Sequence, residues 1–260
     1  MSSPLYRVSL AAAVLYGVLV GTSVAADFRV QNSVFLEGST EPISRTTTLF
    51  KSGRIYDIWE EPKAAAIFDV AEKRVIHLDR SRQVRVELSF RDIDTFTQQW
   101  RSLAATHRDR LFRFLLQPKF EEDFDAAAGK LVLRSDWLTY RITAFAPADR
   151  AAVGRYVRFS DVAVKLAPLI NPNAPPPFAR LAVNRVLGDR GQLPREVHLS
   201  RVLRSEDPRA RLNLRAEHRF EWRLRQDDLE SIRQIERQRV LFAQVGLEKF
   251  RQPRQADKRR

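Results

Sequence analysis

The chain has 260 residues, of which 45 are Lys or Arg and 32 are Asp or Glu, so the formal net charge is +13. It contains no cysteine, which excludes disulfides, thiolate zinc sites, a cysteine nucleophile and an acylated amino-terminal Cys anchor. Most basic residues are Arg, and Glu and Asp are interspersed among them. This spread disfavours a nucleic-acid partner, since nucleic-acid binding usually needs a basic patch or stripe.

The first 26 residues have the three parts of a secretory signal: Arg7 in a polar start, an apolar run over residues 10–20, and small residues that end at Ala26. We expect cleavage before Asp27 and an exported protein, periplasmic or extracellular. A retained anchor is the alternative, because residues 8–26 carry no charge and a spanning helix needs about 20 residues. After cleavage we expect no membrane span, one domain over residues 27–250, and a disordered basic tail over 251–260.

The first third of the mature chain alternates apolar and polar residues with a period of two, which predicts β-strands. The first strand is expected near residues 28–36. Short apolar runs separated by turns follow at residues 46–51, 54–59, 64–69, 74–79 and 84–90. Such closely spaced runs are typical of an antiparallel meander.

The period then changes to that of a helix. Asp92 is expected to cap one helix that ends at Pro118, and strands follow near residues 120–124 and 138–143. A second helix is predicted over residues 148–166. The segment 168–177 contains five prolines, which predicts an extended connector, and a short helix over 178–187 comes next.

Residues 211–225 show the clearest alternation in the chain, with apolar side chains at even positions and mostly charged ones at odd positions. A flat strand of this length would span about 50 Å, so it must bend, split or curl. A last helix is expected to be capped near Asp227. Together these elements predict an α+β fold, a curved antiparallel sheet or incomplete β-barrel covered by about three α-helices.

The stretch 46–88, with its step I-F-D…V-I-H-L-D from Ile67 to Asp79, resembles the meander of exported lipoprotein carriers of the LolA/LolB type. This resemblance implies a half-barrel with an apolar concavity for acyl chains, closed by helices. The carriers open with an amphipathic helix, whereas this chain opens with a strand at Phe28. The whole chain also resembles an uncharacterised family of exported bacterial proteins, which implies no activity.

Two functions follow as hypotheses. The first is a non-catalytic envelope protein that binds an apolar or amphipathic, lipid-like ligand in the half-barrel, with Trp100, Tyr140, Phe220 and Trp222 as lining residues. The alternative is a concavity filled by its own core and an interaction module whose basic face binds anionic envelope components or a protein partner. Its expected contacts are Arg219, Arg223 and Arg225.

No catalytic pattern, cofactor motif or metal site is predicted. His77 and Asp79 share one face of a strand, but they are too few for a metal cage, and we expect a solvated polar face. His218 and His107 are expected to be structural, the second on the apolar stripe of the first helix. The acidic cluster at residues 121–125 lacks the pattern of a calcium loop and is expected to be a solvated patch.

Overall fold

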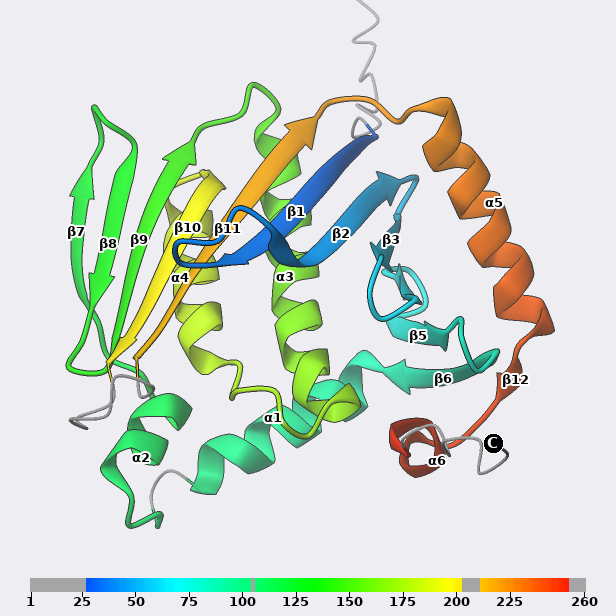
Figure 1. The fold of residues 1–260 in the computed structure, drawn as a ribbon, viewed down its shortest axis with the longest axis horizontal. Coiled ribbons are helices and arrows are strands. Elements are labelled where there is room, and N and C mark those ends of the chain that lie inside the picture. Colours follow the sequence, from blue (N-terminus) through cyan, green and yellow to red (C-terminus); the bar gives the residue numbers. More distant parts are fainter. Residues whose placement is uncertain (1–26, 104–105, 203–210, 253–260) are drawn as a thin grey trace, which may run out of the picture.

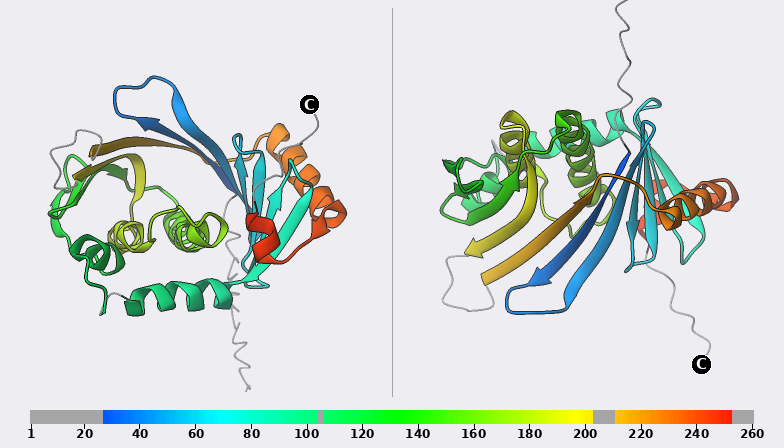
Figure 2. Two further views of the ribbon diagram at one scale, coloured as in Figure 1. Left: turned by 60° about the horizontal axis from the view of Figure 1, so that its bottom comes forward. Right: turned by 90° about the horizontal axis from the view of Figure 1, so that it is seen from above.

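The computed structural model describes residues 27–103, 106–202 and 211–252, and within them one twelve-stranded sheet organises the fold (Figure 1). The strand order is β12-β6-β5-β4-β3-β2-β1-β11-β10-β9-β8-β7, and all neighbours are antiparallel except β12 and β6. The sheet is curved (Figure 2), and it ends in two different edge strands, β12 and β7, so it is not closed into a barrel. The strands are β1 (Phe28–Leu36), β2 (Pro42–Lys51), β3 (Arg54–Trp59), β4 (Ala64–Asp69), β5 (Arg74–Asp79), β6 (Val84–Ser89), β7 (Glu121–Asp125), β8 (Lys130–Arg134), β9 (Leu138–Phe145), β10 (Leu193–Val202), β11 (Arg211–Glu221) and β12 (Ala243–Gln244).

Helices cover both faces of this sheet (Figure 2). The curve of the sheet encloses α3 and α4, while α5 packs on the outer face of the β2–β5 part. The fold is therefore the α+β architecture with a curved, unclosed sheet that the sequence predicts, although the helices exceed the expected three. They are α1 (Phe90–Leu103), α2 (Arg110–Leu116), α3 (Arg150–Ile170), α4 (Phe178–Asp189), α5 (Gln226–Leu241) and α6 (Leu247–Arg251).

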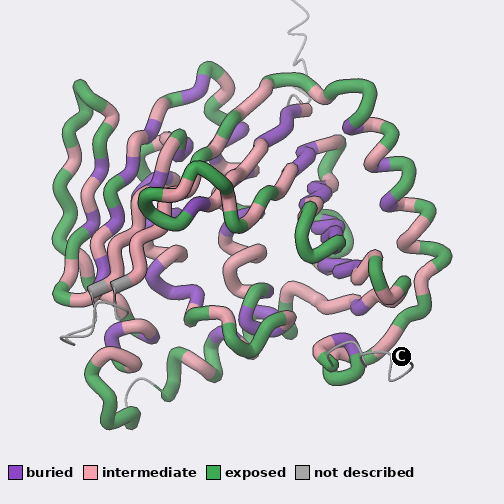
Figure 3. Tube along the Cα trace, in the orientation of Figure 1, coloured by how far each residue is buried: buried purple, intermediate pink, exposed green. Residues whose placement is uncertain are grey.

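The predicted meander is confirmed, because β2 to β6 lie side by side in chain order. Its short strands alternate as expected, but the middle of the meander is buried on both faces. Every residue of β4 is buried (Figure 3). Phe68 and Ala66 pack inward against α3, and Ile67 and Ala65 pack outward in the cluster that holds Ile232 of α5. The expectation of one apolar face per strand is thus wrong here, since the last helix supplies a second cover.

The concave side holds two packed clusters. One joins β1–β5 to α3 and includes Phe28, Phe50 and Phe159. The other joins β8–β11 to α4 and α2 and includes Tyr140 and Val183. The inner face of the sheet is therefore largely filled by helices, with cavities where the packing of α3 is incomplete.

The single helix expected from Asp92 to Pro118 is two helices. Ser89 caps α1, because its hydroxyl accepts the N–H of Asp92 at 3.0 Å while the Asp92 carboxylate accepts the N–H of Ser89 at 3.3 Å. Asp109 caps α2 by accepting the N–H of Phe112 at 2.9 Å. A second cap inside the predicted helix starts a new one, so His107 is exposed between the helices and not on an apolar stripe.

The predicted connector from Pro168 begins too early, since α3 continues through Pro168 to Ile170. Pro168 and Leu169 are buried, and the packing of this last turn outweighs the loss of one backbone donor. The predicted cap of the last helix also moves: the backbone N–H of Arg225 donates to the Asp228 carboxylate at 2.7 Å, and α5 begins at Gln226.

The predicted strand over residues 211–225 is shorter than expected: β11 is one continuous strand that ends at Glu221, and residues 222–225 lead into α5. Sequence analysis missed its partner β10, in which Pro194 interrupts the alternation. The tail expected from Arg251 starts inside α6, which buries Phe250, and residues 253–260 lie outside the described part. Among the described residues, no helix is both long and apolar enough to cross a membrane.

Candidate functional site

The first candidate site is a cavity of about 540 Å³ between α3 and the concave face of β3 and β4, called here the large α3 cavity. The helix presents Phe159 and Val162 to it, and the strands present Ile55 and Phe68. These helix residues face the sheet because the buried positions of α3 recur three and four residues apart. The cavity is mostly apolar, as sites for apolar ligands are.

A second cavity of about 280 Å³, called the small α3 cavity, lies farther along the same helix. Ala163, Leu166 and Ile170 of α3 line it, opposite Trp59 of β3. Phe68 lines both cavities and stands edge-on to the Phe159 ring at 5.0 Å. One aromatic ring therefore forms a wall common to two apolar spaces along α3.

Two arginines line the large α3 cavity. Arg158 is exposed and forms no ion pair within the described residues, whereas the Arg155 guanidinium lies over the Phe28 and Phe50 rings at 5.1 and 5.6 Å. Burial lowers the pKa of Arg155, and the Arg158 charge adds to this effect. The cavity thus combines apolar walls with two neighbouring cations.

One carboxylate also lines this cavity. Asp161 accepts a hydrogen bond from the Asn184 side chain at 2.8 Å, and burial raises its pKa. Asn184 is itself fully enclosed and donates to Ser160 at 3.0 Å. This network ties α3 to α4 and fixes the helix wall of the cavity.

The four predicted lining residues do not meet at one place. Trp100 is half-buried on α1, where it contacts Phe96 and the small cluster around Leu116 and Phe178. Tyr140 is buried in the cluster under α4. Neither lines a cavity along α3, because the residues that do so come from β3, β4 and α3.

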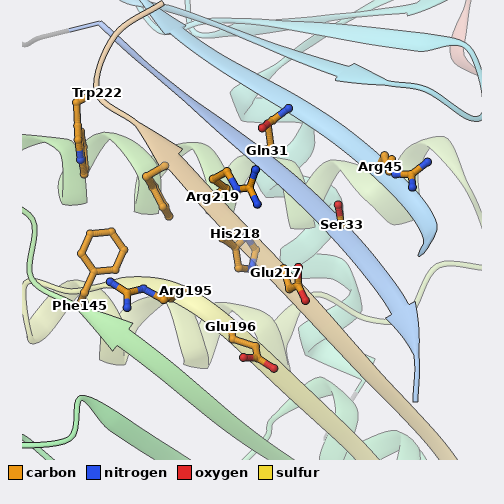
Figure 4. A pocket seen from close by; sticks show the side chains of 11 residues that line it. Gln31, Ser33, Arg45, Phe145, Arg195, Glu196, Glu217, His218, Arg219 and Trp222 are labelled. Atoms are coloured by element: carbon orange, nitrogen blue, oxygen red, sulfur yellow. The ribbon is translucent and has the colours of Figure 1, made fainter. Parts of the chain in front are cut away.

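Phe220 and Trp222 do lie together, with ring centroids 5.9 Å apart. They line a third cavity of about 660 Å³, called the fork, which lies between β10 and β11 (Figure 4). The pairing of β10 with β11 ends at Glu196 and Glu217, whereas β11 continues to pair with β1 as far as Glu221.

The fork is an opening in the sheet. Residues 217–220 all line it, although successive side chains of a strand point to opposite faces. A cavity can reach both faces only where neighbouring strands have parted. The pairing of β10 with β9 also shifts between Pro194 and Glu196, so a bulge turns this end of β10 away from β11.

The three predicted anion contacts are all exposed, but their surroundings differ. Arg219 lines the fork. Arg225 holds the Glu221 carboxylate with two hydrogen bonds of 2.7 and 2.9 Å. Arg223 forms no ion pair within the described residues and does not line the fork.

A polar row crosses the concave face from β11 to β3. His218 Nδ1 lies 2.6 Å from the Asn32 Oδ1 atom, and the Asn32 amide donates to Thr48 at 3.4 Å. The Thr48 hydroxyl then donates to the Asp57 carboxylate at 2.7 Å. Because the Asn32 amide nitrogen is used as a donor, Nδ1 of His218 carries the proton and Nε2 is the unprotonated nitrogen.

Burial sets the charge of this row. It raises the pKa of Asp57 to about 7, although the Thr48 hydrogen bond opposes the shift. It lowers the pKa of His218 to about 3, and the nearby Arg180 charge acts in the same direction. His218 is thus a neutral core histidine with one nitrogen hydrogen-bonded and Nε2 without a partner in the described residues.

His77 corrects another prediction. It is buried and not on a solvated face, stacked on Trp59 at 5.4 Å and edge-on to Phe250 at 5.4 Å. Burial lowers its pKa to about 4. Asp79 has a different role: its carboxylate accepts the backbone N–H groups of Ser81 and Arg82 in a turn. Within the described residues no group of three or more acidic, His or Cys side chains could hold a metal ion.

Sequence reasoning missed both α3 cavities. Phe68 and Phe159 lie 91 positions apart, and only the packing of α3 on β4 brings them together. One signal was present: Arg155 and Arg158 precede Phe159 and Val162 at helical spacing, which places two cations and two apolar residues on one side of a helix.

No protein-family model matches the chain, and no curated protein matches it. A search of solved structures finds similarity to a LolA superfamily protein from Nitrosomonas europaea, with 9% sequence identity and a TM-score of 0.28. The match covers 78% of this chain and 88% of the other. The fold class stated above rests on the strand order and the helix positions of this chain.

Proposed function

We propose that this chain is an exported, non-catalytic binding protein that holds an amphipathic, lipid-like ligand between α3 and the concave face of the sheet. The observation that carries the proposal is the large α3 cavity, about 540 Å³ of mostly apolar space lined also by two arginines. Its size is in the usual range for small-molecule sites, about 300 to 1,000 Å³.

The apolar part of the ligand is expected to lie along α3. From Arg158 to Asn171 the helix rises by about 20 Å, and both cavities lie along this length. A chain that extends from one cavity into the other must displace the Phe68 ring. Contact with Ile55, Val162 and Leu166 would replace contact with water and supply the main driving force.

The polar end of the ligand is expected to be anionic. Arg158 is exposed and Arg155 lies beside it, so a carboxylate or phosphate at this end would gain charge-assisted hydrogen bonds. A free fatty acid and an acidic phospholipid share this chemistry, and binding experiments with each distinguish them.

Export is part of the proposal and is supported by residues 1–26, whose Arg7, apolar run and terminal small residues are typical of a secretory signal. In the envelope, a carrier of this kind would meet its ligand at a membrane surface. The net charge, which is +13 for the whole sequence and one less once Arg7 leaves with the signal, would favour approach to anionic lipids.

The test uses the purified chain freed of lipid by organic extraction and then titrated with palmitate, with calorimetry as the readout. Val162→Trp places a bulky ring in the large α3 cavity and should abolish binding. The matched control is Val240→Trp, since Val240 lies on the outer helix α5 and is 71% exposed. Arg158→Gln should weaken binding about tenfold, and Arg150→Gln, on the same helix outside the cavity, should not.

Binding that survives Val162→Trp unchanged would overturn the proposal, and so would the absence of binding to palmitate and to phosphatidylglycerol alike. Thermal melts of all four variants show whether each folds. If palmitate binds and phosphatidylglycerol does not, the ligand class is a free fatty acid.

A further inference from the structure

The fork is distinct from the α3 cavities in place and in chemistry. It opens through the sheet between β10 and β11, and the aromatic rings of Phe28, Phe50 and Tyr156 lie between it and the large α3 cavity. An inference about the fork therefore does not depend on the proposed function.

Aromatic rings form one end of the fork. Trp222 is 45% exposed, and its indole stacks on Phe220 with an interplanar angle of 22°. The Phe145 ring of β9 stands edge-on to Phe220, with ring centroids 5.5 Å apart. A partly exposed indole backed by two rings offers a flat, rigid surface for the apolar face of a ligand.

Unpaired cations lie next to these rings. Arg195 and Arg219 are exposed, line the fork and form no ion pair within the described residues. The Arg195 guanidinium lies 5.3 Å from the centre of the Phe145 ring, which places the cation at the aromatic end. Arg45, at the rim, is held only loosely by Glu41 and Glu60, each at 3.9 Å.

The fork is not a simple anion site, because two carboxylates line it. Glu217 pairs with Arg215, and Glu196 contacts His198 Nε2 at 2.5 Å. Each carboxylate keeps acceptor capacity, since one carboxylate offers about four lone-pair sites. A compact anion would be repelled by these groups, whereas hydroxyl groups would donate to them.

Two neutral polar side chains complete the wall. Gln31 and Ser33 line the same cavity from β1, across β11 from β10, and their side chains form no hydrogen bond within the described residues (Figure 4). An amide and a hydroxyl supply both donors and acceptors, so they suit a ligand rich in hydroxyl groups.

We propose that the fork binds an acidic saccharide. The C–H face of a sugar ring would stack on Trp222, and its carboxylate would lie between Arg195 and Arg219. The hydroxyl groups would be held by Gln31, Ser33 and the two glutamates. This ligand satisfies every class of group in the fork, while an inorganic anion or a simple aromatic ring satisfies only part of them.

The experiment titrates the full chain with a trimer of galacturonic acid and with its methyl ester, in which the charge is removed and the hydroxyl groups are kept. Quenching of tryptophan fluorescence and calorimetry give the two dissociation constants. The acid should bind at least tenfold more tightly than the ester, and added salt should weaken the difference. Inorganic phosphate should bind more weakly than the acid.

The matched variants distinguish a specific binding site in the fork from unspecific binding to a basic surface. Arg195→Gln and Arg219→Gln should each weaken binding of the acid about tenfold, and Trp222→Ala should remove the fluorescence change. Arg223→Gln removes one charge from the same exposed end of the strand but outside the fork, and it should leave binding unchanged. Thermal melts check that each variant folds.

Equal binding of the acid and the ester, absence of binding by either, or an equal loss in Arg223→Gln and Arg219→Gln would overturn the proposal. Phosphate binding as tight as that of the acid would show that the fork recognises charge alone. The Val162→Trp variant should bind the saccharide normally, so that failure at the fork and failure at the α3 cavities are distinguishable.

Discussion

The α3 cavities and the fork are two kinds of cavity that incomplete packing leaves on one curved sheet. The α3 cavities lie between a helix and the concave face, so their walls are mostly apolar, with two arginines at the large cavity and His77 and Asn171 at the small one. The fork lies where two strands part, so side chains of both faces line it, and they include aromatic, cationic, acidic and neutral polar groups. Where a cavity lies relative to the sheet therefore decides what it can bind.

A stack of aromatic rings divides the two regions. Phe28 and Phe50 are stacked with centroids 4.1 Å apart, and Tyr156 lies 6.5 Å from Phe50 and 5.3 Å from Phe220. Phe50 also contacts Phe159 at 5.6 Å, on the side of the large α3 cavity. Substitutions in this aromatic partition, in the polar row from His218 to Asp57 and at the rim of the fork test how the two regions differ.

The largest effect is expected for Phe50→Ala. Phe50 is fully buried in the partition, so its loss removes ring contacts and leaves a cavity between the two sites. The free energy of unfolding should fall by about 3 to 5 kcal/mol, measured by urea denaturation. A loss below about 1 kcal/mol would mean that the partition is not part of the core.

A smaller effect of opposite sign is expected for Asp57→Asn at about pH 8. The pKa of Asp57 is raised to about 7 in the folded chain, above its unfolded value. Its contribution to stability is therefore full below about pH 4 and is lost as the pH rises through about 7.

The asparagine variant should thus be more stable than the original chain by a few kcal/mol at alkaline pH, with the difference vanishing toward about pH 4. Asn still accepts the Thr48 hydrogen bond, so the change isolates the charge. Urea midpoints across this range provide the measurement, and a destabilised variant at alkaline pH would contradict the assigned burial.

His218 and His77 should lower the free energy of unfolding as the pH becomes acidic. The pKa of His218 is lowered to about 3 and that of His77 to about 4, so their contribution is present above the unfolded value of about 6.5 and is lost as the pH falls. His218→Asn keeps a donor for Asn32 and removes the titration. Acid unfolding of this variant should be less steep between about pH 6 and pH 4, and an identical profile would contradict the interpretation.

The smallest effect is expected at the rim of the fork. Arg225→Gln breaks an exposed pair with Glu221, and the free energy of unfolding should change by less than about 1 kcal/mol. Saccharide binding should also be unchanged, because Arg225 does not line the fork. A calorimetric titration and a thermal melt together check both expectations.

The meander could be read from the sequence because the strands of β2–β6 are separated by short turns and each pairs with the next along the chain. Local periodicity is sufficient for such elements. The break between α1 and α2 carried a readable signal, a cap at Asp109, but the continuous apolar spacing concealed it. In β10, Pro194 and the shift beside it concealed a strand.

The sites were less predictable for a physical reason. Phe220 lies in β11 and Trp222 just beyond its end, so these two rings are close because they are close in the sequence, whereas Trp100 and Tyr140 belong to other clusters. The parting of β10 from β11 depends on pairing with β9 and β1 on opposite sides, which no local pattern records. The α3 cavities depend on how closely one helix approaches the sheet.

The most direct test of the central claim is a titration of the extracted chain with palmitate, followed by methyl NMR. The signals of Ile55, Val162 and Leu166 should move with the ligand, while those of Val30 and Val197, on the strands β1 and β10, should stay fixed. Shifts confined to Val30 and Val197, or no shift at all, would contradict a lipid-binding site between α3 and the sheet.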